Sequence, residues 1–247
     1  MTKPIYAVGD IHGQQAELLR VLDLIEADGG PEAEIVFIGD YTDRGPASSD
    51  VLDTLIDGLE AGKNWHCLKG NHDRMFSWFM RDYPAHDAYL PVYLYWLHER
   101  LGGDTTLASY GIKMTQTDRQ TDVHDLAKKA VPQRHVDFLD SLALSFENDD
   151  LFFAHAGIQP GVQLDQQSEH DLLWIRKEFH IDTRDHGKLV VHGHTPVETA
   201  THYGNRVNID AGAGYGRPLA AVVFEGQECW SLTDQGRISL HPTDGTS

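Results

Sequence analysis

The 247-residue sequence is short of cysteine and of positive charge. Its two cysteines, Cys67 and Cys229, are too few for a disulfide framework; their spacing permits a single bridge, and a reduced chain is the simpler interpretation. Lys and Arg together number 20 against 38 Asp and Glu, which gives a formal net charge of −18. A general nucleic-acid or membrane-surface binder needs a basic face, so the composition argues against both kinds of partner.

Long hydrophobic runs are also missing. No stretch approaches the 18 apolar residues of a membrane-spanning helix, and the opening MTKPIYAVGD contains no apolar segment of signal-peptide length. We therefore expect a cytoplasmic protein. A hydrophobic fraction of 40% with 23% charged residues is typical of a folded globule. No coiled-coil heptad is present, which is consistent with a monomer but leaves the oligomeric state open.

The first eighty residues repeat one local pattern three times. Apolar runs at 5–8, 35–38 and 65–68 are followed, directly or after Lys69, by a glycine and then Asp or Asn, and a helical pattern follows each. These helices are expected at 14–28, at 50–59 and through 75–79. Strand, glycine turn and helix in succession predict a mostly parallel sheet, and ligands of such sheets bind beyond the carboxyl ends of the strands.

Residues 82–150 interrupt this pattern. Helices are expected at 89–101, 105–110 and 133–142, without strands, as a helical cap-like insertion in a single domain of residues 1–247. The aromatic residues at 89–96 are interpreted as packing of the first of these helices, and the histidines of this part as solvated. Strand signals resume at 151–154, 189–191 and 207–209, and 220–224 is expected to form a hairpin with 228–232. The fold class is therefore α/β.

Five glycine-flanked polar clusters follow the apolar runs: GDIHG (9–13), GDYTDRG (39–45), GNHD (70–73), HAG (155–157) and HGHT (192–195). Each alone is more typical of a turn, a helix cap or a buried histidine, but their joint occurrence favours a site. Carboxylate, amide and imidazole groups together suit first-row divalent metals. The candidate ligands are Asp10, His12, Asp40, Asn71, His155 and His194, with Asp40 as the natural bridge between two ions.

The order of these motifs resembles the phosphoprotein phosphatase branch of the calcineurin-like metallophosphoesterases, in particular the compact bacterial Ser/Thr protein phosphatases. The resemblance implies a central β-sandwich flanked by helices, with a dinuclear metal site at the strand ends. It assigns Asp10 and His12 to one metal, Asp40 to the bridge, and Asn71, His155 and His194 to the other metal. Manganese is the ion that the family suggests, and iron, zinc and nickel are compatible.

The same resemblance implies roles beyond metal binding. Asp43 and His72 match a pair in which the protonated histidine gives a proton to the leaving oxygen, although Asp43 could instead pair with Arg44. The residues expected to contact the substrate phosphate are Arg44, Arg176, Asn71 and Tyr215. Asp210 is either a support for a metal ligand or part of a strand-end turn, and His192 is either a supporting or a core residue.

The expected function is a metal-dependent phosphomonoesterase that acts by direct attack of a hydroxide held by two metals. A protein serine/threonine phosphatase, with dual specificity open, fits best, and its substrate would be a phosphorylated protein or a small phosphate ester. One alternative is a symmetrical bis(5'-nucleosyl)-tetraphosphatase, whose relatives tend to lose the acid that Asp43 supplies here. Another is a noncatalytic binding module, which would be expected to lose metal ligands.

Overall fold

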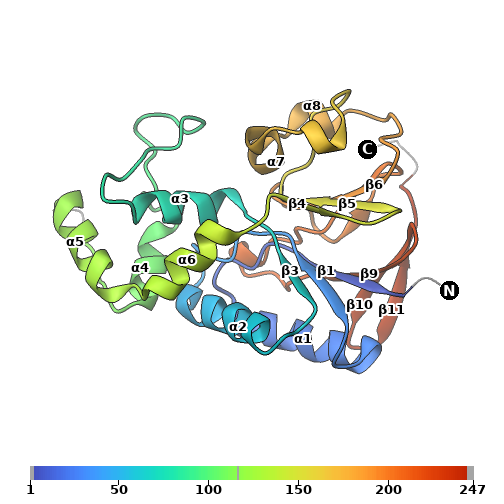
Figure 1. The fold of residues 1–247 in the computed structure, drawn as a ribbon, viewed down its shortest axis with the longest axis horizontal. Helices are drawn as coiled ribbons and strands as arrows, with labels where there is room; N and C mark the ends of the chain where they lie inside the picture. The colour runs from blue at the N-terminus through green and yellow to red at the C-terminus, as the bar shows by residue number, and fades with distance from the viewer. Residues whose placement is uncertain (1–2, 116, 244–247) are drawn as a thin grey trace.

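Two mixed β-sheets pack face to face at the centre of the molecule, in a computed structural model that describes residues 3–115 and 117–243 (Figure 1). The first sheet has six strands in the order β11-β10-β9-β1-β2-β3. Its three neighbouring strands β1, β2 and β3 run parallel, as the repeated pattern predicts. The strands of this sheet are β1 (Ile5–Val8), β2 (Glu34–Phe37), β3 (Trp65–Cys67), β9 (Ala221–Glu225), β10 (Glu228–Thr233) and β11 (Gly236–Leu240).

The second sheet has five strands in the order β4-β5-β6-β8-β7, with β5, β6 and β8 parallel at its centre. Apolar side chains of both sheets meet in the layer between them, with Ala7 and Val36 on one side and Phe153 and Val191 on the other. Both faces of these central strands are covered, which explains their continuous apolar runs. The strands of this sheet are β4 (Ser145–Glu147), β5 (Leu151–Ala154), β6 (Leu189–His192), β7 (Thr201–His202) and β8 (Arg206–Asn208).

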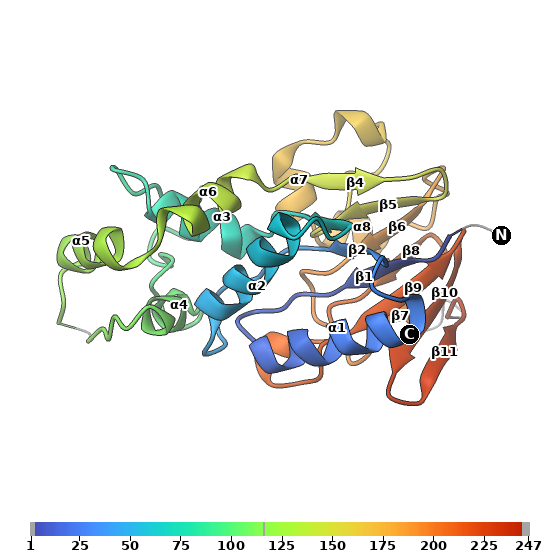
Figure 2. The same cartoon turned by 60° about the horizontal axis from the view of Figure 1, so that its bottom comes forward.

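Helices cover the outer faces of the sandwich. Helices α1 (Gln15–Gly29) and α2 (Ser48–Glu60) lie against the first sheet, as Figure 2 shows, and confirm the helices expected at 14–28 and 50–59. The short helices α7 (Glu169–Trp174) and α8 (Lys177–His180) cover the second sheet through Leu172 and Phe179. A sandwich flanked by helices is thus the observed architecture, and the expected α/β class is confirmed.

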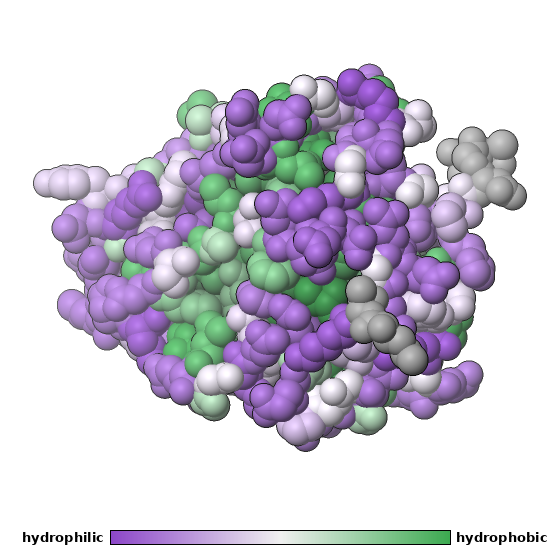
Figure 3. All heavy atoms as spheres, turned by 45° about the vertical axis from the view of Figure 1, so that its right-hand side comes forward, coloured by the Kyte–Doolittle hydropathy of each residue, from purple (hydrophilic) through white to green (hydrophobic). Residues whose placement is uncertain are grey.

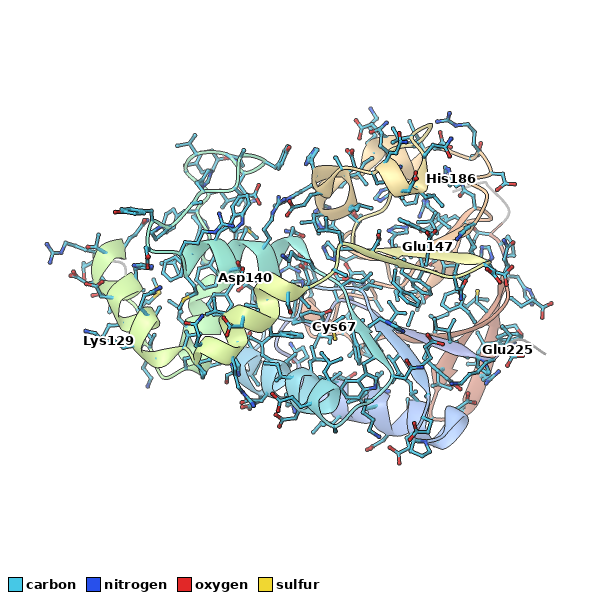
Figure 4. The ribbon with its side chains drawn as sticks, viewed as in Figure 1. Cys67, Lys129, Asp140, Glu147, His186 and Glu225 are labelled. Carbon is cyan, nitrogen blue, oxygen red and sulfur yellow. The ribbon has the colours of Figure 1, made fainter. Side chains whose placement is uncertain are left out.

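The remaining helices gather at one end of the sandwich. They are α3 (Asn71–Phe79), α4 (Gly103–Ser109), α5 (Gln120–Ala130) and α6 (Gln133–Ser141). Helices α3 and α6 pack together, and Ser77 of α3 donates a hydrogen bond to Asp140 of α6, which is labelled in Figure 4. Helices α4 and α6 confirm two of the three helices expected between residues 82 and 150.

The structure corrects four expectations for residues 82–150. The helix at 89–101 is wrong: the segment is a series of turns, because Pro91 has no N–H for a helical hydrogen bond and its ring favours a break. Helix α5 was missed, and strand β4 shows that this part is not free of strands. His135 is buried rather than solvated, because Tyr110 and Asp53 bond its two ring nitrogens.

Hydrophilic side chains dominate the face shown in Figure 3, with apolar side chains visible in its depressions. Within residues 3–115 and 117–243, no helix is both long and apolar enough to cross a membrane. Cys67 and Cys229 are free thiols, as a reduced chain requires, and burial raises the pKa of Cys229 to about 11.

Candidate dinuclear metal site

The five polar clusters converge at one edge of the sandwich. Each follows the carboxyl end of a parallel strand: β1, β2 and β3 in one sheet, and β5 and β6 in the other. Hydrogen bonds join the clusters to one another. The backbone N–H of His72 donates to Asp40 Oδ1 (2.9 Å), and that of His194 donates to Asp10 Oδ2 (3.1 Å). Segments far apart in the sequence therefore share one buried site.

The backbone of these clusters is strained. Among the described residues, the non-glycine residues in the left-handed region all belong to the predicted site: His12 (φ 48°), Asp40 (54°), Asp43 (73°), Arg44 (67°) and His194 (65°). Such a conformation costs on the order of 1–3 kcal/mol for each residue and persists only where the surrounding structure enforces it. The strained backbone of these residues therefore lowers the stability of the fold and at the same time orients their side chains toward one site.

Asn71, His155 and His194 bring polar side-chain atoms within hydrogen-bond distance of one another. Nδ1 of His155 donates to the carbonyl oxygen of Ile38 (3.0 Å), so its Nε2 carries a lone pair. That Nε2 lies 2.9 Å from Asn71 Oδ1 and 3.2 Å from His194 Nδ1, which is itself 2.8 Å from Asn71 Oδ1. His155 Nε2 and Asn71 Oδ1 are both acceptors, and they repel each other at this distance unless a cation lies beside them, so the three groups fit a metal ion.

Asp40 lies between two such sets of ligands. Nδ1 of His12 donates to the carbonyl oxygen of Thr42 (2.8 Å), so the lone pair of the ring is on Nε2, which contacts Arg44 in the structure and could bind a metal in its place. Asp40 Oδ2 is 3.5 Å from His12 Nε2 and equally 3.5 Å from His155 Nε2. A carboxylate equidistant from two metal-binding imidazoles is placed to bridge two ions.

The protonation states suit metal binding. Burial lowers the pKa values of His12, His155 and His194, so these imidazoles are neutral near pH 7, as metal ligands must be. Burial would raise the pKa of Asp40, but at acidic pH the charge that the surrounding imidazoles acquire, His155 first, opposes protonation of Asp40 and holds its pKa below the usual range. Asp40 is therefore ionised.

The pKa of Asp10 shifts in the opposite direction to that of Asp40. Burial raises its pKa well above the usual range, and the carboxylates of Asp210 and Asp40 act in the same direction. A divalent cation beside Asp10 and Asp40 would remove the repulsion between these carboxylates. Together with the facing lone pairs, this makes the residue set fit two divalent ions.

Two glycines allow this close packing. A Cβ atom on Gly70 would lie 2.1 Å from Asp40 Oδ1, and one on Gly193 would lie 2.1 Å from Asp10 Oδ1. Any side chain at either position would displace a carboxylate of the site.

Asp43 and His72 form a hydrogen-bonded pair beside these ligands. Nδ1 of His72 donates to Asp43 Oδ2 at 2.6 Å, and both side chains are buried. The opposite ring nitrogen, Nε2, lies 3.1 Å from Nη2 of Arg44. The carboxylate thus fixes the ring so that Nε2 faces the site, the orientation that proton transfer to a substrate requires.

Two residues that sequence reasoning did not assign to the site hold Asp43. Nε1 of Trp96 donates to both oxygens of Asp43 (2.9 and 3.1 Å), and Oγ1 of Thr106 donates to Oδ1 (2.7 Å). The interpretation of Trp96 as packing alone is therefore incomplete, although it does stack on Phe76 with ring centroids 4.9 Å apart. Neither residue belongs to a motif, so the sequence carries no signal for this role.

For the phosphomonoesterase expected from the sequence, replacing Trp96 by phenylalanine should lower kcat for phenyl phosphate about tenfold, because hydrogen bonds to a charged group contribute about 1.5–3 kcal/mol. The aromatic stack is retained in this variant, so the change isolates the N–H group. Trp230→Phe, in β10 of the first sheet, is the matched control. A W96F enzyme with unchanged kcat would show that Trp96 has only a packing role.

Asp73 is a second positioning residue that sequence reasoning left without a role. Its carboxylate accepts hydrogen bonds from the backbone N–H groups of Asp40 (2.7 Å), Tyr41 (2.9 Å) and Gly70 (3.0 Å). Burial, with a contribution from Asp40, raises the pKa of Asp73 to about 7. Asp73 thus ties together the loops that follow β2 and β3.

Arg44 lies across the centre of the site. Its Nη1 is 2.7 Å from His12 Nε2, and its guanidinium carbon lies 4.8 Å from the centre of the Tyr215 ring. Arg176 is exposed at the rim and donates to Thr195 Oγ1 (3.3 Å). Although the residue is exposed at the rim, partial desolvation of its guanidinium lowers the pKa of Arg176. This guanidinium also interacts electrostatically with Asp40. The structure therefore brings Arg44 and Tyr215 together and places Arg176 within electrostatic reach.

Asp210 and His192 have structural contacts. Asp210 accepts a hydrogen bond from the backbone N–H of Gly212 (2.9 Å), the strand-end turn that was one of its two expected roles. Burial raises the pKa of Asp210 to about 6. His192 is buried, and Nη1 of Arg206 lies 3.1 Å from its Nε2, which favours the core role.

The family model for the calcineurin-like phosphoesterases matches residues 3–224 of this chain. The asymmetrical bis(5'-nucleosyl)-tetraphosphatase PrpE of Anoxybacillus flavithermus is 28% identical over 250 residues, which cover 91% of this chain and 92% of that protein. The protein of the same name from Oceanobacillus iheyensis is 27% identical over 254 residues, with 92% and 91% covered.

Solved structures with similar folds include phosphatases that are named for different substrates. The cold-active protein-tyrosine phosphatase of a psychrophilic Shewanella has a TM-score of 0.62 at 18% identity, and 98% of this chain and 81% of that chain are covered. A structure provisionally named a diadenosine tetraphosphatase has a TM-score of 0.60 at 22% identity, with 99% and 96% covered. At these identities the likeness concerns the fold alone.

Proposed function

The chain belongs to the calcineurin-like phosphoesterase family, and from that premise we propose that it is a metal-dependent phosphatase for phosphorylated protein side chains. Serine and threonine phosphates are the proposed substrates, and tyrosine phosphate is accepted as well. The observation that carries this proposal is the buried Asp43–His72 pair, which lies beside the metal ligands His12 and Asp40. A leaving alkoxide is strongly basic and needs a proton during bond cleavage, whereas a leaving nucleotide phosphate does not.

Six residues would hold two divalent ions, manganese by analogy with the family: Asp10, His12, Asp40, Asn71, His155 and His194. When bound, the ions supply Lewis-acid stabilisation and lower the pKa of water. Nε2 of a protonated His72 would carry the proton that the leaving oxygen receives, with Arg44, which contacts this nitrogen in the structure, turned to the phosphoryl group. Asp43 holds that ring in place, and Trp96 and Thr106 hold Asp43.

Arginine side chains would bind the phosphoryl oxygens. A planar guanidinium can donate two parallel hydrogen bonds to one phosphoryl group, which suits the central position of Arg44. Arg176 supplies a second positive charge from the rim, and Tyr215 stacks against Arg44 and limits its motion. Asn71 combines metal binding with a contact to the phosphate.

Arg44→Lys tests the phosphate-binding role while it keeps the charge. We expect kcat/KM for phenyl phosphate to fall about 10- to 100-fold, because an ammonium group cannot reproduce the paired hydrogen bonds. Arg119→Lys, at an exposed ion pair with Asp122, is the matched control and should leave kcat/KM unchanged. Equal kcat/KM for R44K and the unchanged enzyme would remove Arg44 from the phosphate site.

A second candidate is the asymmetrical cleavage of bis(5'-nucleosyl) tetraphosphates. The names of the two bacterial relatives favour it, because each alignment covers about nine-tenths of both chains. These names support asymmetrical cleavage rather than the symmetrical cleavage considered from the sequence.

Substrate comparison separates the two candidates. We expect kcat/KM to be higher for phosphoserine and phosphothreonine peptides than for bis(5'-adenosyl) tetraphosphate, with manganese supplied to both. The reverse order, with AMP and ATP as products, would favour the second candidate. Fewer than two metal equivalents after manganese reconstitution, together with no turnover of either substrate, would favour a noncatalytic binding module.

We also propose how the chain is organised into a domain and where it acts. Residues 1–247 form one domain that acts in the cytoplasm, and residues 82–150 act as its cap. Limited proteolysis tests it: cleavage should concentrate in residues 82–101, whose turns contain several exposed side chains, and leave the sandwich intact.

A further inference from the structure

A cavity of about 440 Å³ lies outside the metal site, between α3, the turns of residues 82–97 and the start of α5. Ligand cavities in proteins start at about 300 Å³, so this one has room for a small organic molecule. None of the six proposed metal ligands lines it. The cavity therefore needs an explanation separate from phosphate hydrolysis.

The lining combines aromatic rings with carboxylates. Phe79, Tyr95 and Trp96 provide aromatic surface, and the lining contains three aspartates but no lysine or arginine. An ammonium or guanidinium group is attracted both by aromatic faces and by carboxylates. This chemistry suits an organic cation that carries an apolar stem.

The three aspartates of the lining differ in their partners. Asp87 pairs with the buried Arg74 (2.8 Å), and Asp82 pairs with Lys128 (3.3 Å) at the exposed rim. Within residues 3–115 and 117–243, Asp125 has no ion-pair partner. Asp125 is thus the carboxylate with charge available for a cationic ligand.

Trp96 is shared between this cavity and the catalytic pair. It lines the cavity, and its N–H group donates to Asp43, which in turn accepts the hydrogen bond of His72. A ligand that packs on Trp96 would restrict the indole to the position in which it holds Asp43. One side chain thus connects the cavity to the proposed proton donor.

We propose that the cavity binds an organic cation with an apolar stem, and that this ligand raises the rate of hydrolysis by fixing Trp96 against Asp43. The cation is either a free amine or a basic side chain of the substrate protein, since both carry the same group. The effect on the rate rests on the function proposed above, whereas binding does not.

Binding is tested on the full chain by calorimetric titration with phenethylamine, with phenethyl alcohol as the uncharged analogue. We expect saturable binding of the amine alone. Asp125→Asn should weaken it about three- to fivefold, the effect of one exposed charge pair. Asp137→Asn, at an exposed position of α6 outside the cavity, is the matched control. No saturable binding, equal binding of the alcohol, or an unaffected D125N variant would overturn the proposal.

The effect on the rate is tested with two esters. Saturating phenethylamine should raise kcat for phenyl phosphate, whose leaving phenoxide is about as basic as tyrosinate with a pKa of about 10. It should leave kcat for 2,4-dinitrophenyl phosphate unchanged, because that leaving group needs no proton. Binding with no change in kcat for phenyl phosphate would overturn the link to Asp43. If neither ester is hydrolysed, the proposed function fails while the binding result stands.

The source of the cation is decided by paired phosphopeptides that differ only in one arginine or glutamine near the phosphoserine. A kcat/KM advantage for the arginine peptide that D125N removes identifies a substrate side chain. An equal kcat/KM for both peptides, with the amine still raising kcat, identifies a free amine.

Discussion

Replacing His72 by asparagine is expected to lower kcat for phenyl phosphate by about 10²- to 10⁴-fold, the usual contribution of a general acid. The side chain keeps polar atoms near Asp43 but loses the ring nitrogen that faces the site. The loss should shrink to a few-fold for 2,4-dinitrophenyl phosphate, because its weakly basic leaving group departs without a proton. Measurement of kcat for both esters over the same pH range provides the test.

Metal content must be measured beside these rates. His72 lies close to His12 and Asp40, so a loss that is equal for the two esters, with fewer metal equivalents, would assign His72 to metal binding instead. The matched control is His98→Asn, in a partly buried turn outside the metal site, which should change neither kcat nor metal content. An H72N enzyme with full kcat on phenyl phosphate would refute the proposed proton transfer.

Asp40→Asn is expected to have the other large effect. Metal analysis after manganese reconstitution should find two equivalents in the unchanged chain and at most one in the variant, because an amide has a single oxygen and no charge for bridging. Metal ions contribute several kcal/mol to transition-state stabilisation, so kcat should fall about 10³-fold or more.

The variant should fold, because asparagine has nearly the same shape and is among the residues that tolerate the left-handed backbone of Asp40 (φ 54°). Asp10 repels the buried carboxylate of Asp40, whereas the imidazoles around Asp40 favour its ionised form, so these effects oppose each other and the temperature of thermal unfolding without metal should change little. Asp57→Asn, at the exposed end of α2, is the matched control. Two bound equivalents and near-normal kcat in D40N would contradict the bridging role.

Much of this architecture follows from local sequence. The runs that became β1, β2, β5 and β6 are apolar because both faces of these strands are buried, and a glycine follows each within a few residues. The carboxyl ends of parallel strands share one edge, so the polar residues behind them had to meet. Asp10, Asp40 and His155 could be placed at one site from this reasoning alone.

The 82–101 segment shows where local reasoning stops. Its aromatic and aliphatic residues recur at helical spacing, yet the chain forms turns around Pro91. Trp96 and Leu97 are buried against the α3 side of the core while Tyr93 is exposed, so packing onto a neighbouring helix determines the path of this segment.

The sequence by itself determined the family of folds, the ligand types and the strand ends that carry them, because hydrophobic pattern and glycine turns act over a few residues. Only the tertiary structure decided how the site is held. Trp96 and Thr106 reach Asp43 across 53 and 63 residues of sequence, and Asp40 Oδ2 lies midway between two imidazoles. The contacts of Trp96 and Thr106 depend on how the 82–150 segment packs beside the sandwich, and the position of Asp40 depends on how the two sheets pack. Hydrogen bonds to a buried carboxylate depend on distances of a few tenths of an ångström, which no residue pattern encodes.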